Sequence, residues 1–429
     1  MKKIITILAF AAAAFSAFAQ DSKPSIEVHG FIRNFYAFDT REMKGLTEDF
    51  FTYVPLDEKL VAVPSGNVDV NGYPNFRFAA LTSRLWVEVK GYEVEGWKVG
   101  ARVEGDFYNG LGDDKVTGTA NFRLRQAFVT LAKKDWTFKA GQSWHPMAAD
   151  MPDVFSLNTG APFGPFSRTP LAQMDYKFAD GFSLTGAALW QMQYTSTGPD
   201  GKSAKYIKYG CTPEIYLGLN YKAEGLTMRA GINMLSIKPV LRDDFGFRTD
   251  RITTFTPFFY AQYAKDLFSV KFKTVFAEAG DHVNLNGGYG VKNVLEDGNR
   301  EYTPTRNSSS WISLCYGKKV QAILFAGYVK NFGTKEALAA DATGKKPVGF
   351  WFSGNSFDNL NQMARVTPTI IYNLGKVAFG LEYEMTTVQY GQKTDASGVS
   401  LINLSNGLYD QGLHWITNHR VQGLIKYTF

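Results

Sequence analysis

The connections between alternating apolar and polar segments sort into two lengths, and this sorting most constrains the fold. Period-2 runs recur along the whole chain at 25–39, 76–90, 97–109, 121–132, 136–145, 168–178, 182–195, 212–222, 226–236, 252–264, 267–279, 309–317, 320–330, 364–373, 376–390 and 414–429. Long links (40–75, 110–120, 146–167, 196–211, 237–251, 280–308, 331–363, 391–413) alternate with short ones (91–96, 133–135, 179–181, 223–225, 265–266, 318–319, 374–375). Tight turns at one end and long loops at the other are typical of an even-numbered up-and-down barrel. The sequence therefore predicts an all-β, transmembrane antiparallel β-barrel of about 16 strands.

Each run separates into an apolar face and a polar face. In 97–109, Val99, Val103 and Phe107 share one face, whereas the charged residues share the other. An Arg or Lys facing lipid at mid-depth costs roughly 2–4 kcal/mol, so the charged faces should point inward. A barrel of this size leaves an aqueous lumen rather than a core filled by side chains.

The inward-pointing charges form the candidate site. Five arginines lie near the middle of strands that become neighbours once the barrel closes: Arg33, Arg84, Arg102, Arg125 and Arg420. Their common height predicts a basic stripe halfway along the lumen. The alternative is that these are scattered solvated charges with no shared role. The candidate basic wall is Arg33, Arg84, Arg102, Arg123, Arg125 and Arg420, and the other predicted lumen charges are Glu88, Glu104, Asp106 and Lys139.

The patterns at the two ends of the sequence indicate export from the cytoplasm and insertion into the outer membrane. Residues 1–19 have two lysines, an apolar stretch and a small-residue cleavage pattern, and are interpreted as a cleaved signal peptide, which leaves 20–429 as a single barrel domain. At the other end Ile425, Tyr427 and Phe429 alternate on the apolar face. This ending resembles the C-terminal signature of bacterial outer-membrane barrels, which implies recognition by the barrel assembly machinery.

Composition excludes several classes of protein. Without Lys2 and Lys3, 44 basic residues stand against 40 acidic ones, too small an excess to indicate nucleic-acid binding. Two cysteines make no disulfide framework, and we interpret both as free side chains. The five histidines show no metal-site spacing, and no nucleotide-binding motif is evident, so we expect no cofactor and no metal.

The whole chain resembles the sixteen-stranded outer-membrane porins. The stretch "RLRQAFVTL…FKAGQSWHPM…PDVF", from Arg123 to Phe155, is similar to the corresponding strands and inward loop of the DcaP-like and phosphate-selective porin branch. The resemblance implies a homotrimer in contact with outer-membrane lipid and lipopolysaccharide. It also implies passive diffusion of small hydrophilic solutes, with a preference for anions such as carboxylates and phosphate. Because the first predicted strand follows the signal peptide at once, we expect no N-terminal coiled coil of the DcaP type, and the predicted strands carry no dense ladder of lysines like that of a dedicated phosphate channel.

The third long link, 146–167, occupies the place of the porin loop that folds into the lumen. It is rich in Pro, Gly and small residues and carries Asp150 and Asp153 but no lysine. If it folds inward, these carboxylates should face the arginine stripe across a constriction, and such a transverse field favours polar or anionic solutes.

The sequence thus favours a porin of the bacterial outer membrane and not an enzyme. One alternative is a structural or adhesive barrel that binds partners through its long loops. Another is a hydrolase at the barrel rim, for which Asp106 and His145 are candidates, although no nucleophile is paired with them. An energised transporter would need a plug domain and about 22 strands.

Overall fold

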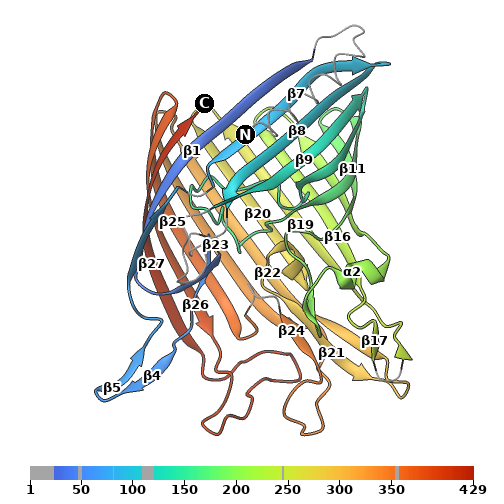
Figure 1. Cartoon of the computed structure of the whole chain (residues 1–429), viewed down its shortest axis with the longest axis vertical. Helices are drawn as coiled ribbons and strands as arrows, with labels where there is room; N and C mark the ends of the chain where they lie inside the picture. The colour runs from blue at the N-terminus through green and yellow to red at the C-terminus, as the bar shows by residue number, and fades with distance from the viewer. Residues whose placement is uncertain (1–23, 47–50, 81, 109–119, 244–245, 353–356) are drawn as a thin grey trace.

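A computed structural model describes residues 24–46, 51–80, 82–108, 120–243, 246–352 and 357–429, so the predicted signal peptide lies outside the described residues. Sixteen antiparallel strands close into a barrel (Figure 1). In order around the wall they are β1 (Ser25–Asp39), β7 (Arg84–Val94), β8 (Trp97–Tyr108), β9 (Asn121–Lys133), β10 (Trp136–Trp144), β11 (Arg168–Ala179), β12 (Phe182–Leu189), β15 (Glu214–Lys222), β16 (Leu226–Ile237), β19 (Ile252–Lys265), β20 (Phe268–Glu278), β22 (Arg300–Tyr316), β23 (Val320–Thr334), β25 (Leu360–Leu374), β26 (Val377–Tyr390) and β27 (His414–Thr428). The predicted fold class is confirmed.

The largest differences between predicted and observed strands are three, and β23 and β25 each also extend four residues beyond one end of their predicted ranges. The predicted strand 76–90 is split into β6 (Asn75–Ala79) and β7, which pair with different parts of β1. β12 ends at Leu189, and the residues after it turn into a loop where Gln191 and Tyr194 are buried. β22 starts at Arg300 and not at 309, because its polar first half pairs with the loop strand β21 (Gly288–Val294).

Two prolines inside strands sit where the ladder is incomplete. Pro257 in β19 pairs with Ile232 of β16, and pairing with β20 starts only at the next residue. Pro368 in β25 pairs with Leu324 of β23, whereas the ladder to β26 is interrupted there. A proline has no N–H to donate, and each of these prolines occupies a position where one of the two neighbouring strands is not paired with it.

The barrel closes through pairing of β1 with β27, at the end of the molecule that carries the C-terminus in Figure 1. The last residue takes part: the N–H of Phe429 donates to Gly30 O (3.0 Å), and the N–H of Gly30 donates to Phe429 O (3.2 Å). A Cβ on Gly30 would lie 2.4 Å from the Phe429 ring, so glycine makes room for that ring across the seam. The terminal aromatic residue is therefore part of the closure.

The outer surface carries large apolar side chains along every strand, with aromatic rings near the short turns. Trp136, Phe178, Phe268, Tyr316 and Tyr372 are all exposed there, as expected for an interfacial aromatic girdle. Within the described ranges, no helix is long and apolar enough to cross a membrane.

The long connections gather at the opposite end, the lower one in Figure 1. Their elements are β2 (Met43–Leu46), β3 (Phe51–Pro55), β4 (Leu60–Val63), β5 (Gly66–Asp69), β13 (Thr197–Gly198), β14 (Gly201–Lys202), α2 (Lys205–Gly210), β17 (Arg242–Asp243), β18 (Gly246–Phe247), η2 (Gly280–Val283), β21 and β24 (Phe350–Phe352). Four of these connections contribute to one buried apolar cluster that includes inward-facing wall residues such as Trp311 and Phe325. Their members are Tyr53 of β3, Phe163 of loop 146–167, Tyr194 after β12 and Leu285 after η2. The sequence predicted an inward course for the third loop alone.

Candidate functional site

Register places charges of opposite sign opposite one another on the wall formed by β7, β8 and β9. Arg84 lies beside Asp106, which lies beside Arg123, and Glu88 lies beside Arg102. A bulge in β9 makes Arg125 an additional residue between two paired positions. The strand pairing therefore brings the predicted arginines and carboxylates together before any side chain is considered.

The side chains complete a continuous charge network. Glu104 accepts hydrogen bonds from Arg125 Nε (2.6 Å) and Arg102 Nη2 (2.5 Å), and Arg84 lies 3.5 Å away. Asp106 accepts from Arg123 Nε (2.7 Å) and Arg125 Nη1 (2.8 Å). Both carboxylates are essentially inaccessible, whereas three of the arginines keep a fifth to a quarter of their side chains exposed. The exposed edge of the network is therefore made of guanidinium groups.

Two more arginines extend this wall. Arg33 donates from Nε to Thr82 Oγ1 (2.7 Å) and lies over the rings of Phe31 and Phe35. Arg168, which the sequence analysis did not name, donates to Gln193 and stacks 4.8 Å from the centre of the Trp144 ring. In the described part of the chain neither has a carboxylate within 4 Å. Six arginines therefore share three carboxylates on this wall.

Arg420 is not part of the accessible wall, which corrects its predicted role in the constriction. It points into the barrel but is fully buried, and it binds Asp39 through Nη2–Oδ2 (2.7 Å) and Nε–Oδ1 (2.9 Å). Asp39 and Arg420 are register partners on the first and last strands. The pair joins the two strands that close the barrel.

The carboxylates of the third loop contact a different wall from the one predicted. Asp153 forms an ion pair with Lys271 (2.5 Å), and Asp150 lies 3.4 Å from Arg229 Nε. These partners are on β20 and β16 and not on the arginine stripe. The expectation was wrong in its partners because it assumed a basic wall on one side alone, and Arg229 and Lys271 were not among the candidates.

The same loop is attached to strands that lie across the barrel from its own. Lys273 of β20 donates from Nζ to the carbonyl oxygens of Met147 (2.8 Å) and Asp150. Farther along, the N–H groups of Phe155 and Ser156 donate to the Glu382 carboxylate of β26 (3.0 and 3.2 Å). Because each anchor is a charged group satisfied by main-chain atoms, the loop is held across the lumen.

Farther along the loop, Arg365 of β25 forms a third anchor. It donates to Ala161 O (3.1 Å) in this loop and to Tyr53 O (3.0 Å) in β3. One guanidinium thus fixes two inward segments at once.

A buried His–Glu–His cluster joins the start of this loop to the turn η2. Glu214 Oε1 lies 3.0 Å from His145 Nε2 and 3.1 Å from His282 Nε2. His145 Nδ1 accepts from the Met147 N–H, which makes this ring neutral with its proton on Nε2. His282 Nδ1 lies 3.1 Å from the carbonyl oxygen of Ala279, and the Asn233 amide nitrogen lies 3.4 Å from its Nε2.

The rim-hydrolase candidates take part in separate networks. Asp106 is bound by two arginines, and His145 is bound by Glu214. Among the residues that the structure describes, neither is hydrogen-bonded to a serine, threonine or cysteine side chain.

One group in the described residues has the ligand types of a metal site. Glu27, His29 and Glu88 bring three ligand atoms within 4.8 Å of one another. The ammonium of Lys90, however, lies 2.9 Å from Glu27 and 2.8 Å from Glu88. A cation of this chain therefore already occupies the position between the two carboxylates.

Comparison with known structures identifies the fold. The chain matches the crystal structure of the outer membrane channel DcaP of Acinetobacter baumannii with 17% identity and a TM-score of 0.66, over 96% of this chain and 99% of that one. The chain has a DcaP-like porin fold. It also matches an anion-selective porin from Comamonas acidovorans with 12% identity and a TM-score of 0.54, over 95% of this chain and 100% of that one. No protein-family model matches the sequence, and a search of curated proteins finds no relative.

Proposed function

We propose that the protein is a porin of the bacterial outer membrane, a water-filled channel for passive diffusion of small hydrophilic solutes with a preference for anions. The observation that carries the proposal is the charge balance inside a closed, externally apolar barrel, where six arginines share three carboxylates on one wall. An excess of fixed positive charge along an aqueous path raises the local concentration of anions.

The proposal includes a homotrimer surrounded by outer-membrane lipid and lipopolysaccharide, assembled by the barrel assembly machinery. The exposed apolar side chains on the outside of the barrel support the contact with lipid, because soluble proteins rarely expose a contiguous apolar surface of this extent to water. The alternating C-terminal residues Ile425, Tyr427 and Phe429, exposed on the outer face, support recognition during assembly. The proposal leaves no place for an enzymatic activity.

Planar-bilayer recording tests the proposal. The purified protein should give stable stepwise currents, in groups of three for a trimer, and a structural barrel, adhesin or enzyme should give little or none. The reversal potential in a salt gradient should have the sign of an anion-selective channel.

The triple variant Arg84→Gln, Arg102→Gln and Arg125→Gln should abolish the anion preference, because three arginines then face three carboxylates. A matched control is Arg251→Gln, which changes an exposed arginine beside α2. Anion selectivity that survives the triple variant would place ion sorting elsewhere in the lumen.

A further inference from the structure

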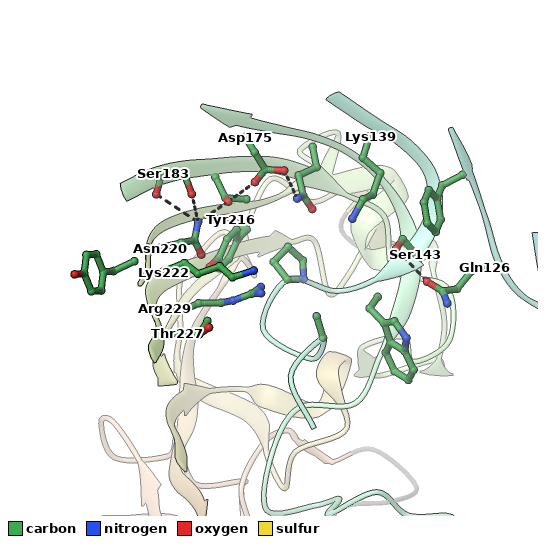
Figure 2. A pocket seen from close by; sticks show the side chains of 17 residues that line it. Gln126, Lys139, Ser143, Asp175, Ser183, Tyr216, Asn220, Lys222, Thr227 and Arg229 are labelled. Atoms are coloured by element: carbon green, nitrogen blue, oxygen red, sulfur yellow. Dashed lines mark hydrogen bonds between the residues drawn. The ribbon is translucent and has the colours of Figure 1, made fainter. Parts of the chain in front are cut away.

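A cavity lies in the lumen beside the arginine network, which it meets at Gln126 and Trp144. It has a volume of about 450 Å³ and is bounded by inward-facing side chains of β9 to β12, β15 and β16. Pro146 and Ala149, at the start of the inward loop, form its other side. Figure 2 shows polar side chains from several strands pointing toward this space.

Three cations from three different strands reach the cavity. Lys139 comes from β10, Lys222 from β15 and Arg229 from β16, and Figure 2 shows the last two side by side. Within the described residues the ammonium groups of Lys139 and Lys222 form no hydrogen bond or ion pair, and that of Lys139 lies 5.4 Å from the centre of the Phe128 ring. Charged donors without protein partners in an aqueous cavity are free to bind an anion.

The acidic groups nearby do not neutralise this set. Asp175 uses Oδ1 for Thr185 Oγ1 and Oδ2 for Gln173 Nε2, so both its oxygens are engaged with the wall. Asp150 of the loop lies 3.4 Å from Arg229 Nε, which leaves the two terminal nitrogens of that guanidinium directed elsewhere. Counting both carboxylates, the cavity keeps an excess of positive charge.

The remaining lining suits a hydroxylated molecule better than a bare ion. Ser143, Ser183, Asn220 and Thr227 present hydroxyl and amide groups around the cations. The amide nitrogen of Asn220 is bound to Thr185 Oγ1 (2.9 Å), which fixes the orientation of its carbonyl oxygen.

Among the aromatic rings that line the cavity are those of Phe128 and Trp144, both partly exposed. Arg168 lies over the Trp144 ring and holds it in place. The rings supply flat apolar surface beside the polar groups.

We propose that this cavity is a binding site for small organic anions that carry several hydroxyl groups, namely sugar acids and sugar phosphates. The acid group binds among Lys139, Lys222 and Arg229, and the hydroxylated body binds along the polar wall and the two rings. The inference rests on the proposed channel function, because the cavity lies in the lumen, and it adds the class of solute that the channel retains.

Single-channel recording with four solutes tests the proposal. A hexuronate and a hexose 6-phosphate should each produce resolved interruptions of the current, with residence times at least about tenfold longer than those of a neutral hexose. Inorganic phosphate should resemble the neutral hexose. The two anionic sugars separate the carboxylate source from the phosphate source of the shared chemistry.

Equal residence of inorganic phosphate and hexuronate would overturn the proposal, because no hydroxylated body would then be recognised. Equal residence of the neutral hexose would overturn it as well, because the cations would then have no role.

The double variant Lys139→Met and Arg229→Gln should shorten the interruptions by about tenfold or more while leaving a conducting channel. Lys265→Met and Arg251→Gln together remove the same charges at exposed positions and should change nothing. If the double variant does not fold, Lys139→Met alone gives the same direction with a smaller effect. Unchanged residence in a folded variant would show that the solute binds elsewhere.

Calorimetric titration of the purified protein with hexuronate separates this inference from the proposed function. Binding that the double variant loses supports the site even without channel currents. A conducting channel that shows neither interruptions nor heat of binding overturns the site alone.

Discussion

Replacing Lys273 with methionine should release the inward loop from the wall. The Lys273 side chain is 1% exposed, and its Nζ holds the carbonyl oxygens of Met147 and Asp150. It also lies 5.5 Å from the centre of the Tyr260 ring and 5.8 Å from that of Trp311. Methionine has a similar length and keeps the apolar contacts but cannot donate to the loop.

The size of the effect follows from these contacts. Hydrogen bonds from a charged donor contribute about 1.5–3 kcal/mol each, and the variant loses two. Part of this loss is offset because a buried ammonium no longer has to be desolvated. We expect the bound loop to be destabilised relative to the released loop by a net amount of about 2–4 kcal/mol. This raises the population of the released loop by about 30- to 700-fold, since 1.4 kcal/mol corresponds to a factor of ten.

Two measurements report this release. In single-channel recordings the variant should show excess open-channel noise and brief steps to higher conductance. Hydrogen exchange of residues 146–155 should accelerate, while the strands keep their protection. The matched control is Lys177→Met, which removes a lysine that pairs with Asp180 at a short turn and is 54% exposed.

Unchanged noise together with unchanged exchange in Lys273→Met would refute the reasoning. The loop would then be held by its other contacts, with Lys271, Glu382 and Arg365 among them, and the buried lysine would contribute nothing to its position.

Three further changes have predictable outcomes. Glu104→Gln removes one negative charge from beneath three arginines and should raise the anion-to-cation permeability ratio by up to about fivefold, read from the reversal potential; a shift toward cations would contradict the charge balance. Phe429→Ala uncovers Gly30 at the seam and should lower the yield of folded barrel on refolding into liposomes; an unchanged yield would mean that the ring does not contribute to closure. In the loop turn, burial raises the pKa of Asp281 to about 6, and the pKa of His282 is also raised because, although burial lowers it, the charge and hydrogen bond of Glu214 act together with Asp281 and the Ala279 carbonyl against that burial. Both groups bind more protons in the folded turn, so the turn should lose stability as pH rises from about 4 to 6 through Asp281, and lose more above about 6.5 through His282, seen as faster hydrogen exchange of 279–287 at pH 8 than at pH 5 after correction for intrinsic rates; equal protection at pH 5 and 8 would contradict this.

The wall of the barrel was predictable because strand parity is a local property. Val103 and Phe107 are exposed on the outside while Glu104 and Asp106 are buried inside, as the alternation along β8 predicts. Both cysteines of the described chain are free, also as predicted. The predicted strand boundaries were wrong where a strand extends beyond the apolar part of the wall, as in β22, which begins at Arg300. Residues there are polar on both faces, so the sequence shows no alternation of apolar and polar residues.

The partners of the charges could not be predicted, since pairing depends on register between strands. A shift of one residue between β7 and β8 would separate Arg84 from Asp106, yet the sequence of either strand would be unchanged. The sequence therefore identified Arg84, Arg102 and Arg125 as inward-pointing residues but not as members of one network with Glu104.

The apolar filling of the lumen was missed for a related reason. Tyr53, Phe163, Tyr194 and Leu285 come from four loops that show no periodicity, and their common cluster forms only when these loops meet inside the barrel. The Pro- and Gly-rich composition of 146–167 was a usable signal for one of these loops, and nothing comparable marks the other three.

The difference between paired and unpaired cations decides which wall acts on a solute at a distance. In the network, each buried carboxylate lies within about 3.5 Å of its arginines, so much of the field cancels beyond a few ångströms. Among the described residues no carboxylate lies in direct contact with Lys139 or Lys222, so more of their field extends into the lumen, where ionic screening limits it to about 8 Å at physiological salt. Selectivity that arises at the unpaired lysines should therefore fall steeply between 0.15 and 1 M salt, whereas selectivity from close contact with the arginines should persist. The salt dependence of the reversal potential thus assigns ion sorting to one wall or the other without any substitution.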